Sequence, residues 1–182
     1  MRTFLALDLP PHISDSLADL AETFRGFAPR QANWVSRPNF HITLQFIGDT
    51  PPHLIPEIIS ITEVRFASLQ GCRFSGATVQ LIPPRNPRLC WIALHCMHPE
   101  LQKKVIAFRR DLQQMDIEVD IRPVKFHITL GRIKKRLPDF LIQKILTTEL
   151  KIDTFTAPGI TLYQSLLRPE GPVYNPLAQY TL

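Results

Sequence analysis

The sequence Phe-His-Ile-Thr-Leu occurs at residues 40–44 and again, unchanged, at residues 126–130. Such an identity between distant parts of a short chain rarely arises by chance, so we interpret it as a trace of internal duplication. Each copy alternates apolar and polar side chains with a period of two, which predicts a half-buried β-strand. Phe, Ile and Leu then face a core, and His and Thr share the opposite face. The repeat therefore predicts two related strands, one from each half of the chain, whose polar faces line one cleft.

The predicted polar faces carry two imidazoles and two hydroxyls, from His41, Thr43, His127 and Thr129. Imidazole has an unperturbed pKa of about 6.5, so near neutral pH one ring can accept a proton while another donates one. Such a pair is suited to in-line cleavage of an ester by general acid and base catalysis. The hydroxyls can donate hydrogen bonds to the non-bridging oxygens of a phosphate, where charge develops. This chemistry requires neither a metal ion nor a cofactor, and we expect none.

The composition of the 182-residue chain is that of a globular protein, with 45% hydrophobic and 20% charged residues. Lys and Arg exceed Asp and Glu by 21 to 16, and the net charge of +5 favours anionic partners such as nucleotides or RNA. The three cysteines, Cys72, Cys90 and Cys96, show no paired spacing, which favours a reducing compartment. The sequence has neither a secretory signal pattern nor an apolar run of about 18 residues. We therefore expect a cytoplasmic protein without a membrane segment. A monomer is our expectation for the oligomeric state, which these features do not set.

Apolar periodicity and turn residues predict a mixed order of elements along the chain. Strands are expected at residues 3–9, 33–36, 40–48, 74–82, 89–96, 117–121 and 126–130, within residues 152–167, and at the end of the chain. Helices are expected at residues 13–27, 54–62, 99–115 and 138–146, with Thr50 as the N-cap of the second. Strands and helices do not alternate strictly, so the order predicts an α+β fold with mostly antiparallel sheets and helices on their outer faces.

Four stretches together resemble the two-histidine phosphoesterase superfamily, whose signature is a pair of His-x-Thr-x motifs. They are Arg2-x-Phe4-x-Ala6, Trp34-Val35 with residues 39–48, residues 126–132, and residues 162–167 followed by Gly171-Pro172 and Tyr174. More narrowly, the chain resembles the bacterial and archaeal RNA 2′,3′-cyclic phosphodiesterases, also called 2′-5′ RNA ligases. The similarity runs nearly from end to end, and paired motifs in this context are far more specific than a single His-x-Thr.

The resemblance implies a bilobal α+β fold that agrees with the order of elements. Residues 1–182 are then a single domain of two intertwined lobes, related by a pseudo-two-fold axis. Mostly antiparallel sheets line a central cleft in such a fold, and the helices lie on the outside. The two motifs face each other across this cleft.

The resemblance also implies an activity. Members of the family hydrolyse a terminal 2′,3′-cyclic phosphate on RNA or a nucleotide to a 2′-phosphate without a metal, and some also join 2′-5′ linkages. Carried onto this chain, His41 is the proton donor to the departing 3′ oxygen, and His127 accepts a proton from the attacking water. Thr43 and Thr129 hold the phosphate. The two copies of the repeat are so alike that the residues themselves do not set which histidine is the acid.

Arg132 follows the second motif and is a candidate phosphate contact. Strict alternation along the strand would aim it away from the face of His127 and Thr129. A β-bulge at Gly131 would turn the side chain back toward that face, and we expect Arg132 to bind substrate. The basic run at residues 134–136 is either a contact for the RNA backbone or ordinary surface charge.

Other kinds of function compete with this interpretation. A non-catalytic nucleotide- or RNA-binding module would use the same groove and tolerate the loss of either imidazole. A histidine-triad nucleotide hydrolase is suggested by the letters His-Ile-Thr, but that chemistry needs several histidines on one strand and each motif has one. A metal site at His95, Cys96 and His98 lacks a carboxylate or a second cysteine at a fixed ligand spacing, so we expect no metal there.

Overall fold

The structure, a computed structural model, describes residues 1–150, 152–168 and 171–182. Its strands are β1 (Arg2–Leu7), β2 (Ala32–Trp34), β3 (Ile42–Asp49), β4 (Arg73–Ile82), β5 (Leu89–Cys96), β6 (His127–Ile133), β7 (Phe155–Thr156), β8 (Gly159–Arg168) and β9 (Gly171–Thr181). Its helices are α1 (Pro11–Phe27), α2 (Ile55–Phe66), α3 (Pro99–Gln114) and α4 (Asp139–Leu146), with short 3₁₀ turns η1 (Arg37–Asn39) and η2 (Pro52–Leu54). Within the described residues, no helix has both the length and the apolar character needed to cross a membrane.

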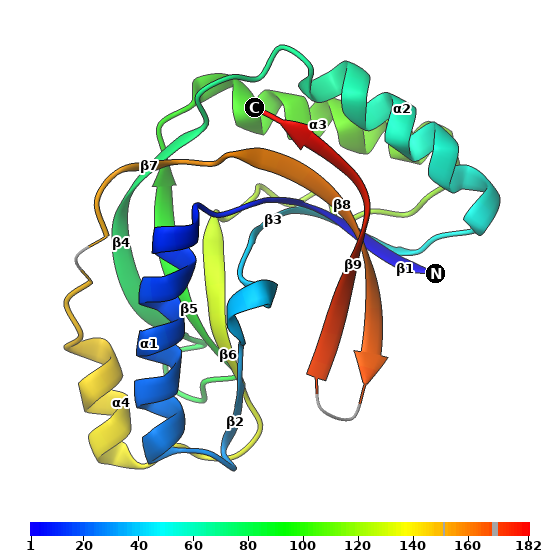
Figure 1. Cartoon of the computed structure of the whole chain (residues 1–182). Helices are drawn as coiled ribbons and strands as arrows, with labels where there is room; N and C mark the ends of the chain where they lie inside the picture. The colour runs from blue at the N-terminus through cyan, green and yellow to red at the C-terminus, as the bar shows by residue number, and fades with distance from the viewer. Residues whose placement is uncertain (151, 169–170) are drawn as a thin grey trace.

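The strands form a curled antiparallel sheet that divides into two halves (Figure 1). Its strand order is β7-β4-β5-β6-β3-β1-β8-β9, and β2 pairs with β6 beside β3. Among the described residues a single register pair, Ile42 with Ile128, joins β3 to β6. This narrow joint separates a first half, β3-β1-β8-β9, from a second half, β6-β5-β4-β7 with β2. The predicted α+β class with antiparallel sheets is confirmed.

Two of the helices, α1 and α3, cover the half of the sheet to which the preceding strand does not belong. α2 packs on α3, and α3 contacts β3 of the first half, whereas α1 contacts β2 and β6 and α4 contacts β4 of the second half. Figure 1 shows α2 and α3 together at one end of the molecule and α1 beside α4 at the other. β1 therefore belongs to the first half, while α1, which follows it directly, covers the second. Consecutive elements therefore serve different halves, so the two halves are interleaved along the chain.

The packing of α1 follows from its sequence. Ile13, Leu17, Ala21 and Phe24 recur at spacings of three and four residues, so they share one helix face, and all four are buried. Pro11 lies in the first turn, where the missing N–H breaks no intrahelical hydrogen bond. The apolar face of α1 thus fixes the helix against the strands that carry the second motif.

Two local predictions were wrong. Thr50 is not the N-cap of α2, because prolines 51 and 52 start a 3₁₀ turn first; its hydroxyl instead lies 2.6 Å from that of Thr3 and ties the end of β3 to β1. Residues 117–121 form no strand. Asp120 accepts hydrogen bonds from the backbone and the side chain of Arg122, and this local turn takes the place of pairing with a neighbouring strand.

Candidate active site

The two motif histidines lie beside the joint between the halves and have matching surroundings. His41 comes just before β3, and His127 begins β6. His41 Nδ1 lies 2.8 Å from the carbonyl oxygen of Asn39, and His127 Nδ1 lies 2.6 Å from that of Lys125. A carbonyl oxygen can only accept, so each Nδ1 carries the hydrogen and each Nε2 is left to exchange a proton with a ligand. Both copies of the repeat therefore hold the imidazole in the same orientation.

One face of the sheet, which we call the motif face, carries the four polar residues of the two repeats, namely His41, Thr43, His127 and Thr129. Ile42 and Ile128 lie opposite each other and are fully buried, so the residues that flank them point away from the core to a common side. Thr43 Oγ1 lies 3.0 Å from His41 Nε2. This nitrogen has no hydrogen in the neutral ring, so the hydroxyl of Thr43 donates to it.

The surroundings of both imidazoles favour the neutral form of the ring. Burial is the main cause that lowers the pKa of His41 from 6.5 to about 4; the Asn39 carbonyl opposes it, and the charges of His127 and Arg132 lower it further. Burial is also the main cause that lowers the pKa of His127. The hydrogen bond to the Lys125 carbonyl raises this pKa, and the charge of Arg132 lowers it further. A bound anion would favour the charged form of either ring and raise both pKa values. The site is therefore arranged so that its protonation responds to an anionic ligand.

Aromatic rings enclose the histidines, and the two halves differ in the rings they supply. In the first half the centroids of the Phe4 and Tyr174 rings lie 4.9 Å and 5.3 Å from that of His41. In the second half the Trp91 ring lies 4.1 Å from that of His127. These rings exclude water from one side of each imidazole, which explains the burial that lowers the pKa values.

Asp8 anchors the aromatic wall of the first half. Its carboxylate accepts hydrogen bonds from the hydroxyls of Thr161 at 2.8 Å and Tyr163 at 2.9 Å. The Tyr163 ring then stacks on Phe4 at 5.2 Å, and Phe4 in turn contacts His41. Because Asp8 and its partners are 153 and 155 residues apart in sequence, no local pattern indicated this cluster.

A pocket of about 470 Å³ lies beside His127 in the second half, with Gln80, Trp91 and Lys125 in its lining. Trp91 Nε1 donates to Gln80 Oε1 at 3.1 Å, which holds the indole ring in place. The sequence did not single out Trp91, although its alternation with buried neighbours on β5 is compatible with a position on the motif face. In the described parts of the chain, no three or more His, Cys, Asp or Glu side chains are grouped so that they could hold a metal ion.

Both motif strands contain a β-bulge at the same position of the repeat. The pairing of β3 with β1 skips Leu44, and the pairing of β6 with β5 skips Leu130. An extra residue shifts the alternation by one, so two consecutive residues are buried and the next one is exposed. The exposed residues are Phe46 and Arg132, which occupy equivalent places in the two halves.

The bulge in β6 falls at Leu130, next to Gly131, and it turns Arg132 toward the motif face. After burial, the charge of Arg132 is a further cause that lowers the pKa of both motif histidines. Burial raises the pKa of Tyr174, and the charge of Arg132 opposes this rise. Gly131 itself packs against the Trp34 ring, and a Cβ there would lie only 2.7 Å from a ring carbon. The strand can therefore approach Trp34 closely only because residue 131 has no side chain.

A curled antiparallel sheet in which each half contributes a His-x-Thr strand to one face is the arrangement of a two-histidine phosphoesterase. The chain belongs to the LigT-like phosphoesterase family, whose model matches residues 7–91 and 97–174. Both motifs lie within the matched residues, and so does Arg132. The family expected from the repeated motif is confirmed.

Proteins named RNA 2′,3′-cyclic phosphodiesterase are among the similar sequences. The one from Methanocaldococcus jannaschii is 26% identical over 193 residues, which cover 99% of this chain and 100% of the relative. The one from Archaeoglobus fulgidus is 28% identical, with 97% of this chain and 98% of the relative covered.

Solved structures have the same fold. The crystal structure of TT0787 of Thermus thermophilus has a TM-score of 0.83 at 26% identity and covers 100% of this chain and 98% of that one. E. coli LigT complexed with 3′-AMP has a TM-score of 0.71 at 21% identity, with 100% and 97% covered, and this likeness shows the fold alone.

Proposed function

We propose that this protein hydrolyses the 2′,3′-cyclic phosphate end of RNA or of a nucleotide to a 2′-phosphate. The observation that carries the proposal is the pairing of Ile42 with Ile128, because it brings one histidine of each motif to the same face of the sheet. The substrate class is supported by the names of relatives that match this chain over nearly its whole length. The net charge of +5 also favours an anionic substrate.

In the proposed reaction a water molecule attacks the phosphorus atom from the side opposite the 3′ oxygen. His127 Nε2 accepts a proton from this water as the new P–O bond forms. The bond between phosphorus and the 3′ oxygen breaks, and the charged His41 donates the proton on Nε2 to that oxygen. The product carries a 2′-phosphate and a free 3′-hydroxyl, and the two rings have exchanged their protonation states. The assignment of donor and acceptor follows the resemblance to the family.

The low pKa of His41 adds a requirement to its assignment as the proton donor. His41 has a pKa of about 4, so it is neutral at pH 7 before substrate binds. A proton donor must be charged, and the proposal therefore requires the substrate phosphate to raise the pKa of His41. Thr43 fits this change, because its hydroxyl donates to the neutral Nε2 and is released when that nitrogen carries a proton. The released hydroxyl can then donate to a phosphate oxygen.

Thr43, Thr129 and Arg132 hold the non-bridging oxygens of the phosphate in this proposal. Hydroxyl and guanidinium donors aimed at the developing charge stabilise the transition state. Arg132 supports this role because its side chain is exposed and its charge already acts on both histidines. The aromatic wall adds no charge, so the cation from β6 is the main electrostatic partner for the phosphate.

The direct test uses a synthetic RNA that ends in a 2′,3′-cyclic phosphate, incubated with the protein in EDTA and followed by identification of the product end. A 2′-phosphate is expected. Activity that disappears in EDTA and returns with added metal would overturn the metal-free mechanism, and a 3′-phosphate would overturn the proposed direction of ring opening. A second RNA with a free 5′-hydroxyl tests joining, because this hydroxyl would replace water and form a 2′-5′ linkage.

We further propose that the protein acts as a monomer in the cytoplasm. The proposal for the compartment is supported by the three cysteines, Cys72, Cys90 and Cys96, whose thiols are free and would persist where disulfides are reduced. Size-exclusion chromatography with light scattering should give the mass of one chain, 20.9 kDa, and a stable dimer would contradict the monomer.

A further inference from the structure

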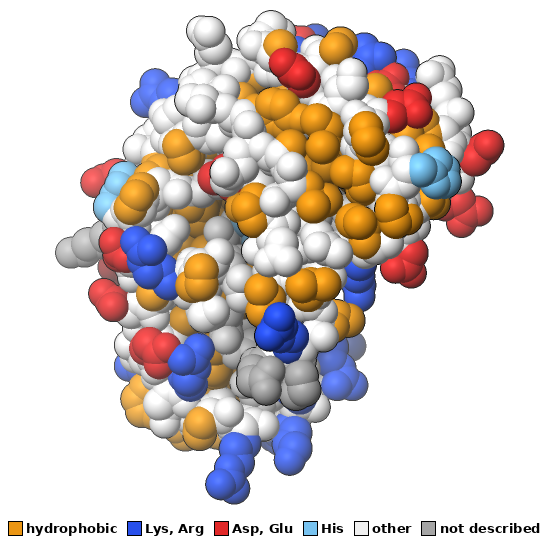
Figure 2. Space-filling view, turned by 45° about the vertical axis from the view of Figure 1, so that its right-hand side comes forward, with side chains coloured by type: hydrophobic (Ala, Val, Ile, Leu, Met, Phe, Trp, Pro, Cys, Tyr) orange, Lys and Arg blue, Asp and Glu red, His pale blue; other side chains and the backbone are white. Residues whose placement is uncertain are grey.

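Apart from the motif face, the surface contains a pocket of about 570 Å³ that we call the basic pocket. Its lining includes five cationic side chains, those of Arg85, Arg88, Lys134, Lys135 and Arg136, and among the described residues one carboxylate, that of Asp139. This local charge of +4 compares with a net charge of +5 for the whole chain. Figure 2 shows Lys and Arg side chains projecting from the lower end of one face, away from the continuous apolar area near its top.

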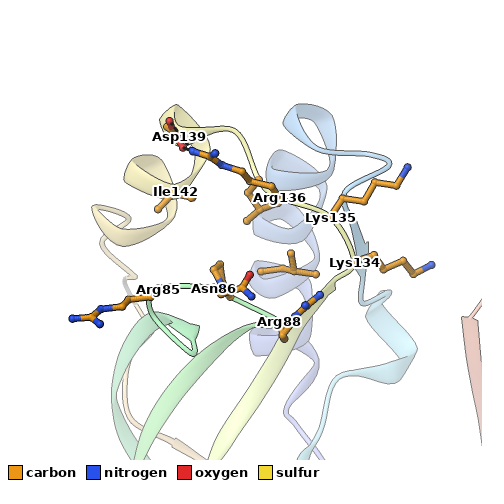
Figure 3. A pocket seen from close by; sticks show the side chains of 11 residues that line it. Arg85, Asn86, Arg88, Lys134, Lys135, Arg136, Asp139 and Ile142 are labelled. Carbon is orange, nitrogen blue, oxygen red and sulfur yellow. Dashed lines mark hydrogen bonds and ion pairs between the residues drawn. The ribbon is translucent and has the colours of Figure 1, made fainter.

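Most of the cations in the basic pocket lack an acidic partner. Arg136 donates from Nη2 to Asp139 at 3.1 Å, but no described carboxylate forms an ion pair with the other four cations. Figure 3 shows the Arg136 side chain reaching toward Asp139, with Arg88 and Lys134 at the opposite side of the pocket. Cations without an acidic partner remain available to pair with the charges of a bound polyanion.

The backbone that presents these cations is held by hydrogen bonds. The carbonyl of Arg88 accepts from the N–H of Ile133 at 2.8 Å, which joins the start of β5 to the end of β6. The N–H groups of Lys134 and Lys135 both donate to the carbonyl of Gln31, at 2.8 Å and 3.0 Å. A ligand that binds to a backbone already ordered in this way loses less conformational entropy on binding.

The basic pocket lies where β5 begins and β6 ends, just beyond Arg132 in the sequence of β6. Arg132, whose charge acts on both motif histidines, pairs with Leu89, and the next residues along the two strands lead directly to Arg88 and Lys134. Lys134 lies seven residues after His127, and at about 3.3 Å per residue this is roughly 20 Å. At about 3.4 Å per nucleotide along a helical strand, the distance corresponds to roughly six nucleotides.

We propose that the basic pocket binds backbone phosphates of the RNA strand whose cyclic phosphate end lies at the motif face, roughly six nucleotides from that end. This inference rests on the proposed function for the identity of the end. The protein then acts on oligonucleotides in preference to cyclic mononucleotides, which cannot reach the pocket. An RNA strand fits better than an acidic protein segment, because one RNA molecule can occupy the motif face and the basic pocket together.

The test compares a 2′,3′-cyclic mononucleotide with a ten-nucleotide RNA that has the same end, using the double variant R88Q/K134Q. Both side chains are exposed and form no side-chain hydrogen bond to a described residue, so the fold should be preserved. The matched control, K103Q/R110Q, removes the same charge from exposed positions on α3. Circular dichroism and thermal melting verify that both variants are folded.

Each lost contact to a phosphate should reduce the slope of log affinity against log salt by about 0.7 for a single strand. For two contacts near physiological salt this amounts to an increase of about tenfold in KM for the ten-nucleotide RNA. We expect this change in R88Q/K134Q, with unchanged kinetics on the cyclic mononucleotide and no change in K103Q/R110Q. In the wild type, kcat/KM should rise with RNA length until the strand reaches the pocket, and in R88Q/K134Q it should not.

If R88Q/K134Q and its control have the same kinetics on the RNA, the inference is overturned. It is also overturned if R88Q/K134Q loses equal activity on the RNA and on the cyclic mononucleotide, because such a loss points to damage at the motif face. If the wild type hydrolyses neither substrate, the proposed function fails separately. Fluorescence anisotropy with the same RNA then decides about the pocket: weaker binding by R88Q/K134Q than by K103Q/R110Q supports it, and equal binding overturns it. A competition experiment tests the choice of occupant. If polyglutamate displaces the labelled RNA at the same concentration as unlabelled RNA, the choice of RNA as the occupant is overturned.

Discussion

Ile42 and Ile128 are direct partners across the joint between β3 and β6, and each is the central residue of one copy of the repeat. Equivalent residues pair with each other in antiparallel strands when a local two-fold axis passes between them. The bulges at Leu44 and Leu130 obey the same symmetry. Duplication followed by this pairing brings the two motifs together on one face, so the chain needs no second copy to complete the proposed site.

Replacing His41 or His127 by Ala should lower kcat on a cyclic phosphate RNA by roughly 10²–10⁴, the usual range for a general acid or base. The fold should persist, because both rings lie at the motif face and outside the apolar core. Steady-state kinetics and thermal melting measure the two effects. His12→Ala, at an exposed position of α1, is the control. Turnover at the wild-type level in both site variants would favour the non-catalytic binding module.

The pH dependence of kcat/KM should be bell-shaped, because one imidazole must be charged and the other neutral. Burial lowers the pKa of His41 to about 4 and also lowers that of His127, so the maximum should lie below about pH 6.5. The substrate phosphate favours the imidazolium form, so the profile of kcat, which reports the complex, should lie at higher pH than that of kcat/KM. Rates measured at constant ionic strength check this, and coincident profiles would contradict it.

Arg132→Gln should reduce kcat/KM by about 10- to 100-fold, since a charge-assisted hydrogen bond contributes about 1.5–3 kcal/mol. It should also move the pH profile of kcat/KM to higher pH, because the charge of Arg132 lowers the pKa of both motif histidines. Arg132→Lys keeps the charge and loses the planar fork, so it should retain the pH profile and recover only part of the rate. A rate loss in Arg132→Gln without any shift of the profile would disprove the electrostatic effect.

The free energy of unfolding should decrease in acid, because the fold holds His41 in its neutral form. The pKa of His41 is about 4 in the folded protein and about 6.5 in the unfolded chain, so the unfolded chain binds the proton more tightly. This contribution is fully present above about pH 6.5 and is lost as the pH falls toward 4, by at most roughly 3 kcal/mol. Urea titrations at several pH values measure it. In His41→Asn the decrease in the free energy of unfolding between pH 6.5 and 4 should be smaller than in the wild type. An identical decrease would show that other groups cause it.

Gly131→Ala should destabilise the fold by about 1–3 kcal/mol, because the added methyl group overpacks against the Trp34 ring. The ring cannot easily move away, since Trp34 Nε1 donates to the carbonyl of Ala28 at 3.0 Å. The matched control is Gly26→Ala in α1, where a Cβ would meet no atom within 4 Å, and it should stabilise the protein by up to about 1 kcal/mol. Denaturant titrations compare the two, and equal effects would contradict the packing explanation.

The sequence by itself was enough to predict the two motif strands, the common face of their histidines and threonines, and the family. These features depend on alternation with a period of two and on residues adjacent in the chain, which are local properties. The same reason explains the agreement for α1, whose apolar spacing predicts a helix wherever it packs. Predictions failed at Thr50 and at residues 117–121, where a weak local signal competed with a 3₁₀ turn and a side-chain turn.

Only the tertiary structure decided what surrounds the motifs. Asp8 and Tyr163 meet across 155 residues of chain, and no pattern within either strand specifies that neighbour. The direction of Arg132 depends on a bulge, which is a property of two paired strands and not of one. His41 and His127 occur in identical pentapeptides yet lie against different rings, Phe4 and Tyr174 in one half and Trp91 in the other, because these neighbours come from distant parts of the chain. The repeat therefore determines which groups meet, and the packing around it determines how each of them behaves.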